Sequence, residues 1–227
     1  MAFSWPQTKR VFFWCVGLCF AVVSGMLPAL ADAPPVRIAV VPGGGSGQEQ
    51  EVVDRINGQL QGNPDVALST MNPDWYVVCS IKEMLDQNSG QVRYNGTVIT
   101  KTTKGQVINT VSMQKYNQDF SLSPGAQLNK KLVDNAVQDV ISGLTERAIG
   151  PIHQAVEVEM ETRERMIKAT RLGNEKKYEE AISLLRPITP ETPHFDAVQA
   201  LKHKLEAQRD AAMHPGAAPP RRKAGAH

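Results

Sequence analysis

The chain is poor in cysteine and in aromatic residues, with three cysteines and 6% aromatic residues in 227. Cys15 and Cys19 both lie in the first 31 residues, so Cys79 is the only cysteine that follows them. One thiol cannot form an intramolecular disulfide, which excludes a disulfide-stabilised scaffold. Cys79 occupies an inward position of an alternating apolar run, so we expect a small buried hydrophobic residue and not a nucleophile.

The sequence also lacks a recognisable catalytic or metal-binding pattern. No two of its histidines sit at metal-ligand spacing with a third ligand nearby, and no serine stands in a nucleophile-elbow setting. These histidines are His153, His194, His203, His214 and His227. We therefore expect no catalytic residue, metal or cofactor, and predict that the protein is not an enzyme. Catalytic residues need only converge in space, so an enzyme is retained as an alternative.

A long apolar segment without charged residues, Val11 to Leu30, follows two basic residues near the start of the chain. Ala29-Leu30-Ala31 supplies the small residues that signal peptidase requires. We interpret residues 1–31 as a signal peptide cleaved near Ala31, which predicts a periplasmic protein. An uncleaved membrane anchor is the alternative. The residue before Cys19 is the bulky Leu18, which argues against lipidation.

Charge gives no indication of nucleic-acid binding. The chain has 25 basic and 23 acidic residues, and removal of the leader takes away two basic ones, which leaves 25 − 2 = 23 of each sign. A neutral chain is not expected to bind nucleic acid. Residues 213–227 are rich in Pro, Ala and Gly and contain Arg221-Arg222-Lys223. This composition predicts a disordered tail, with weak contact to an anionic envelope polymer as the alternative.

Three alternating runs predict the centre of a sheet: Trp75 to Lys82, Val92 to Thr100 and Val107 to Met113. Their period of two and their β-branched and aromatic residues are typical of strands. A hairpin turn is expected at Lys104-Gly105. Asn95-Gly96 is a competing turn signal, but a turn there would leave too short a first strand. Gly96 is therefore predicted to be a bulge or a close-packing point within a strand.

A strand, a glycine-rich loop and a helix are predicted near the start of the mature chain. Val36 to Val41 is the strand, and Val52, Val53, Ile56 and Leu60 place the helix after Gln48. Such a layout is able to hold a phosphate. A P-loop, however, needs a lysine and a hydroxyl where Gln48 and Glu49 stand, so nucleotide binding is disfavoured. We predict a flexible or partner-contacting loop, made of Gly43, Gly44, Gly45, Ser46 and Gly47.

A wide apolar stripe predicts a long helix from Gln127 to Ile149, closed by Gly150-Pro151, that packs on the sheet. A short strand at Val66 to Leu68 is also considered. The predicted fold class is α+β, with a small, three- or four-stranded, mainly antiparallel sheet covered by two helices. A C-terminal helical hairpin is expected to follow it. The predicted domains are 32–150 for the sheet domain and 151–212 for the hairpin.

The hairpin carries a spacing similar to that of a tetratricopeptide (TPR) helix pair. The matching positions are Ala169, Tyr178, Ala181, Leu185, Ile188 and Pro193. A further helix from about Phe195 to Ala211 would act as a cap. Arg165 and Lys168 replace apolar residues of the usual pattern, and one repeat cannot bury a solenoid core. A generic helical hairpin is therefore the alternative, and Tyr178 and Phe195 are candidate partner contacts.

VRIAVVP at 36–42, DWYVVCSI at 74–81 and GQVRYNGTVITKTTKGQVI at 90–108 together resemble a known envelope domain. It is shared by the TolB amino-terminal region, the curli-secretion channel lipoprotein and the lipoprotein activators of peptidoglycan synthases. The resemblance covers roughly Val36 to Ile149 and implies a role in a cell-envelope machine. Gly43 replaces the usual bulky residue, the hairpin turn is unusual and the lipid anchor is missing, which argues against membrane anchoring and pore formation.

Class and compartment together predict a non-catalytic periplasmic interaction or assembly factor of a bacterial cell-envelope machine. Partner capture would use an exposed sheet edge or the glycine loop, with the hairpin as a second surface. The alternative is a small-molecule or glycan carrier, which needs a sizeable pocket with convergent polar groups. The expected partners are envelope proteins. Homo-oligomerisation and peripheral membrane contact are left open.

Overall fold

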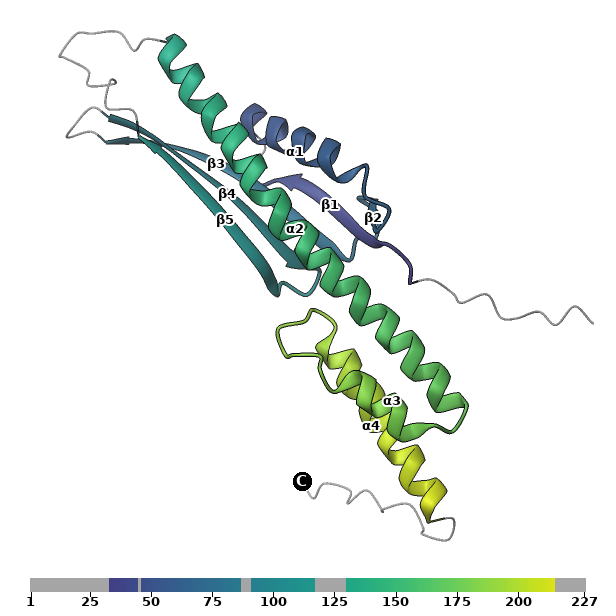
Figure 1. The fold of residues 1–227 in the computed structure, drawn as a ribbon. Helices are drawn as coiled ribbons and strands as arrows, with labels where there is room; N and C mark the ends of the chain where they lie inside the picture. The colour runs from purple at the N-terminus through teal and green to yellow at the C-terminus, as the bar shows by residue number, and fades with distance from the viewer. Residues whose placement is uncertain (1–32, 45, 87–90, 117–129, 215–227) are drawn as a thin grey trace, which may run out of the picture. The chain divides into compact units, whose positions relative to one another are not determined.

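The computed structural model describes residues 33–44, 46–86, 91–116 and 130–214. Contacts divide the chain into Met1–Ala31 and Asp32–His227, and all described residues belong to the second unit. This unit is an α+β fold, which confirms the predicted class (Figure 1). The predicted signal peptide, Gly45, and the tail from residue 215 lie outside the described residues.

The described residues form a five-stranded sheet in the order β2-β1-β3-β4-β5. The three longest strands, β3 to β5, pair antiparallel, whereas β1 runs parallel to both β2 and β3. The strands are β1 (Val36–Pro42), β2 (Val66–Leu68), β3 (Trp75–Asp86), β4 (Gln91–Thr102) and β5 (Val107–Tyr116). The sheet therefore has more strands than the three or four predicted, because the short β2 adds to the edge.

The expected hairpin turn at Lys104-Gly105 is confirmed. Gly105 has a φ of 89°, a left-handed conformation that glycine adopts without a Cβ penalty. Gly96 lies within β4 opposite Ile81, and a Cβ added to it would lie 2.9 Å from side-chain atoms of Val140 and Leu144. Gly96 is thus the predicted close-packing point, where a helix approaches the strand backbone.

The helices are α1 (Gly47–Leu60), α2 (Lys130–Asn174), α3 (Tyr178–Leu185) and α4 (Phe195–Met213). The predicted helix end at Gly150-Pro151 is wrong, because α2 continues through both residues. A proline inside a helix removes one backbone hydrogen bond. Burial of Ile152 and Val156 against the sheet core continues the helix in spite of that loss, and the Asn109 side chain donates to the Pro151 carbonyl at 3.2 Å. In the described ranges, no helix combines the length and apolarity needed to cross a membrane.

Helices α1 and α2 lie on the same face of the sheet (Figure 1). Between them and the strands is the main core, to which Trp75, Val98 and Ile141 belong. Cys79 is fully buried in this core, as predicted, and burial together with the nearby Glu49 charge raises the pKa of its thiol to about 12. A second, smaller core joins the end of α2 to α3 and α4. It consists of Ala169, Leu172, Ala181, Ile182, Leu185, Val198 and Leu205.

Candidate functional site

The glycine loop is closed from within by the carboxylate of Glu49. Ser46 caps α1 by accepting a hydrogen bond from the Glu49 backbone N–H at 3.2 Å. The Glu49 carboxylate in turn accepts from the backbone N–H groups of Gly44 at 2.7 Å and Ser46 at 3.3 Å. Its other oxygen accepts from the N–H of Ile81 on β3 at 3.0 Å. This is a capping box extended to a neighbouring strand.

A phosphate bound to this loop would need the N–H groups that Glu49 already uses. Glu49 is 3% exposed, so an internal anion fills the position that an external anion would take. Position 43 requires glycine for a structural reason, because a Cβ there would collide with the Ser80 hydroxyl oxygen. Gly43, Gly44, Ser46 and Gly47 are nevertheless exposed, and their contact with a partner stays a prediction.

The two hairpin candidates, Tyr178 and Phe195, are both half-buried. Tyr178 begins α3 and packs against the smaller core. Phe195 begins α4, and its backbone N–H donates to the Thr192 carbonyl at 3.0 Å. Among the described residues, no hydrogen bond joins these positions to the glycine loop. Their role in partner contact also stays a prediction.

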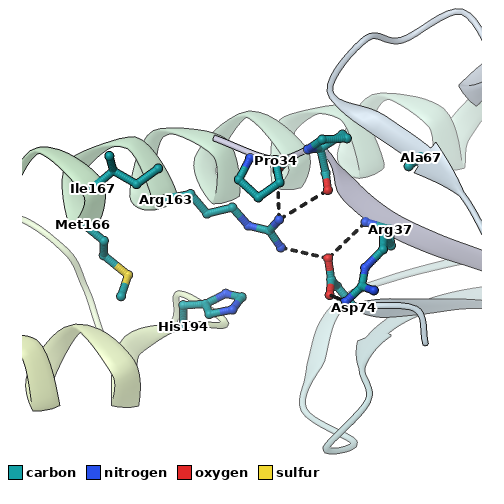
Figure 2. Close-up of a pocket in the computed structure, with 9 residues that line it drawn as sticks. Pro34, Arg37, Ala67, Asp74, Arg163, Met166, Ile167 and His194 are labelled. Carbon is teal, nitrogen blue, oxygen red and sulfur yellow. Dashed lines mark hydrogen bonds and ion pairs between the residues drawn. The ribbon is translucent and has the colours of Figure 1, made fainter. Parts of the chain in front are cut away.

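An open groove of about 650 Å³ lies where the sheet meets the second half of α2; we call it the junction groove (Figure 2). Prolines and an alanine from the sheet side and apolar residues of α2 form its walls. Its lining consists of Pro34, Pro35, Arg37, Ala67, Asp74, Arg163, Met166, Ile167 and His194. The groove thus combines segments that are far apart in the sequence.

The floor of the junction groove is an ion-paired chain centred on Arg163. The Arg163 guanidinium donates to Asp74 at 3.0 Å, and to the carbonyls of Pro34 and Pro35 at 3.0 and 3.3 Å (Figure 2). Asp74 also accepts from the Arg37 side chain at 2.9 Å and from its backbone N–H at 3.1 Å. These bonds join α2 to the beginning of β1 and of β3.

Behind the floor lies Glu159, whose carboxylate is fully buried. It accepts from Arg163 Nε at 2.6 Å and lies 2.7 Å from Nδ1 of His194, in the connection between α3 and α4. Burial raises the pKa of Glu159, but the hydrogen bonds from His194 and Arg163 outweigh it and hold the pKa below its ordinary value. Burial likewise raises the pKa of Asp74, but the hydrogen bonds from Arg37 and Arg163 outweigh it, so this pKa is also lowered.

A second hollow of about 680 Å³ adjoins the first on the other side of Arg37 and Asp74. It is lined by the β2–β3 connection, in which Met71 is 79% exposed. On the junction-groove side, Ile167 is 40% exposed. Exposed apolar side chains therefore flank the ion-paired floor on both sides.

Sequence reasoning missed the junction groove. Glu159 and Arg163 have the same i,i+4 spacing as the more exposed pair Glu161 and Arg165, in which Arg165 Nε donates to Glu161 at 3.2 Å. The spacing alone does not distinguish a buried pair from a solvated one. Asp74 and Arg163 are 89 residues apart, so no local signal joins them. Across the part of the chain that is described, no three His, Cys, Asp or Glu side chains are placed to hold a metal ion.

No protein-family model and no curated protein matches the chain. Among solved structures, a minor lipoprotein from Acinetobacter baumannii is similar at 15% identity and a TM-score of 0.34, over 51% of this chain and 90% of that one. A PelC dodecamer from Paraburkholderia phytofirmans is similar at 14% identity and a TM-score of 0.32, over 52% and 88%. A variant of that PelC, also a dodecamer, gives 15%, 0.32, 52% and 89%. Values this low leave the function of this chain to be inferred from its own residues.

Proposed function

We propose that the protein is a non-catalytic, periplasmic interaction or assembly factor of a bacterial cell-envelope machine, and that it binds a protein partner in the junction groove. The observation that supports this proposal is the groove itself, which has about 650 Å³ of open volume and apolar walls above a floor of paired charged side chains. An apolar groove is one of the recurring surfaces in which a protein binds the apolar face of a partner segment.

The floor favours an apolar protein segment over a polar small molecule. A carrier site directs polar groups at its ligand. Here the guanidinium of Arg163 is directed at Asp74, Glu159 and two backbone carbonyls. Pairing of these charges leaves the exposed side chain of Ile167 and the half-buried side chain of Met166 as the surface offered to a ligand.

The same bonds fix the shape of the groove before any partner arrives. Arg163 is tied both to the sheet side, through Asp74, and to its own helix, through Glu159. A preformed surface loses less conformational entropy on binding than a surface that must be ordered. We therefore expect binding to leave the backbone around Arg163 unchanged.

A comparison of two variants on α2 tests the proposal. Ile167→Glu places a charge on the groove wall, whereas Val158→Glu places one on the same helix outside the groove lining. The two side chains are 40% and 45% exposed, so the changes are matched. Tagged protein is captured from envelope extracts, and co-purified proteins are identified by mass spectrometry. We expect an envelope partner with the wild type and with Val158→Glu, and its loss with Ile167→Glu.

Equal retention of the partner by both variants would contradict binding at the groove. Capture of the protein alone, with a small polar molecule retained in native mass spectrometry, would instead support a carrier. Circular dichroism and thermal unfolding of each variant serve as the control, because a misfolded variant loses partners for trivial reasons.

A further inference from the structure

Strand β5 is an edge of the described sheet and carries little of the usual protection. It has ten residues, and its only neighbour within the described part of the sheet is β4. It contains no proline and one charged residue, Lys115, which pairs with Asp139 of α2 at 2.9 Å. Natural edge strands are normally shortened, charged, bulged or interrupted by proline, because a bare edge pairs with other strands.

The opposite edge of the same sheet shows what protection looks like. Strand β2 has three residues and leads into a connection that ends at the buried Pro73. The register of the β4–β5 pair shifts between Thr100 and Lys101 of β4, which lie opposite Asn109 and Val107 of β5. The irregularity is therefore confined to the beginning of β5. Regular pairing with β4 covers Asn109 to Tyr116, and no described strand pairs with the outer side of that length.

We propose that β5 pairs antiparallel with β5 of a second copy, across a two-fold axis at Ser112, so that one sheet continues through both copies. In this register Val111 lies opposite Met113 and Thr110 lies opposite Gln114. The only charged side chain of the strand, Lys115, lies opposite the neutral Asn109. No like charges meet, and each residue lies opposite one that shares its face of the sheet.

The burial pattern fits this self-pairing. Val111 and Met113 face the helices and pack only partly buried against the main core, so a neighbouring strand would cover their remaining exposed surface. Thr110 and Ser112 point to the other face and are exposed, as residues on the solvent face of a paired strand are. A two-fold arrangement closes on itself, so the edge is consumed in a dimer and does not propagate.

The proposed dimer does not depend on the junction groove, because no residue of the groove lining lies on β5. Failure of one proposal therefore leaves the other standing. The experiment uses the full chain. Its mass is followed across a concentration series by size-exclusion chromatography with light scattering and by sedimentation velocity.

Ser112→Lys tests the axis directly, since the two introduced charges would lie opposite each other. We expect the wild type to become dimeric as its concentration rises and Ser112→Lys to remain monomeric. Ser112→Asp alone should behave like Ser112→Lys, and an equal mixture of the two should restore the dimer. Gln61→Lys, an equal charge at an exposed position after α1, is the matched control and should dimerise like the wild type.

Ser112→Cys gives a readout of register. Opposed Cα atoms in an antiparallel pair are about 4.5–5.5 Å apart, within the span of about 4.4–6.8 Å that a disulfide bridges. We expect rapid oxidation to an intermolecular disulfide, located by peptide mass spectrometry, with Thr103→Cys at the exposed turn as a slow control. A monomer at every concentration overturns the proposal. The same result is expected if β5 pairs with a strand of another protein, and that case also contradicts self-pairing. A dimer indifferent to Ser112→Lys, or equal oxidation rates for the two cysteine variants, overturns it as well.

Discussion

The glycine loop and the junction groove each depend on one buried glutamate, but the two glutamates have opposite consequences. Glu49 is 3% exposed and accepts hydrogen bonds from backbone N–H groups of the loop and of β3. Glu159 is fully buried and is held by the side chains of Arg163 and His194. The first closes a loop that could otherwise bind an anion. The second supports the arginine that forms the floor of an open groove.

The difference shows that a sequence pattern typical of a binding site does not by itself leave a surface that a ligand can reach. A strand, glycines and a helix predict anion binding only if the N–H groups are left for a ligand. In the loop an internal carboxylate takes them, whereas in the groove the charges satisfy one another and leave apolar walls exposed. The predictions below test this contrast, beginning with the largest expected effect.

Arg163→Met should cause the largest loss of stability. It leaves the carboxylate of Glu159 buried without its guanidinium partner, which is expected to cost about 3–4 kcal/mol in the free energy of unfolding. Arg165→Met is the matched control, because Arg165 pairs with the exposed Glu161 on the same helix and should cost less than about 1 kcal/mol. Urea unfolding measures both. Equal effects of the two variants would show that the groove floor has no special structural role.

Glu49→Ala should cost somewhat less, about 2–3 kcal/mol, because it leaves the N–H groups of Gly44 and Ile81 without their charged acceptor. Glu49→Gln keeps one carbonyl oxygen and should lose about half as much. The exposed Glu146 provides the control, Glu146→Ala. If Glu49→Ala unfolds at the same urea concentration as this control, the loop is not held by Glu49 and the comparison fails.

Acid should weaken the groove floor. The pKa values of Glu159 and Asp74 are lowered on folding from ordinary values of 4.5 and 3.8. The unfolded chain therefore binds more protons than the folded chain just below these pKa values. The stability that the two carboxylates contribute is complete above the unfolded pKa values and is lost as the pH falls through the lower pKa values of the folded state. Glu159→Gln should flatten the dependence of the unfolding free energy between pH 6 and about 3, and Glu146→Gln should not. An unchanged slope in Glu159→Gln would contradict this origin.

Ser46→Ala should have the smallest effect, about 1 kcal/mol, since it removes a single capping hydrogen bond to the Glu49 N–H. The double variant with Glu49→Ala tests the capping box as a unit. Because the two side chains act on the same loop, their effects should not add. Strict additivity in urea unfolding would indicate that Ser46 and Glu49 act independently.

Much of the fold could be predicted because it follows local patterns. Alternation along β3, β4 and β5 and the Lys104-Gly105 turn are visible in the sequence and confirmed in the structure. The continuation of α2 through Pro151 was not predictable in the same way. Gly150-Pro151 is a local signal for a helix end, whereas the burial of Ile152 that outweighs it is a tertiary contact. The TPR-like character of the hairpin stays a prediction.

The candidate site was less predictable than the fold. Ser46 and Glu49 have the spacing of a capping box, which the sequence shows and which explains the loop without a ligand. The Arg163–Asp74 pair, in contrast, depends on how α2 crosses the sheet. The sequence contains several i,i+4 charged pairs along that helix, and their spacing does not distinguish the buried pair from the solvated ones.

The most direct test of the account places a photo-crosslinking amino acid at Ile167 in the groove wall or at Gln48 of α1, directly after the glycine loop. Each protein is produced in a bacterial host with an intact envelope and irradiated before extraction. The account predicts a discrete adduct with an envelope protein from position 167 and none from position 48. An adduct from position 48 with none from position 167 would contradict it, and would return partner capture to the glycine loop.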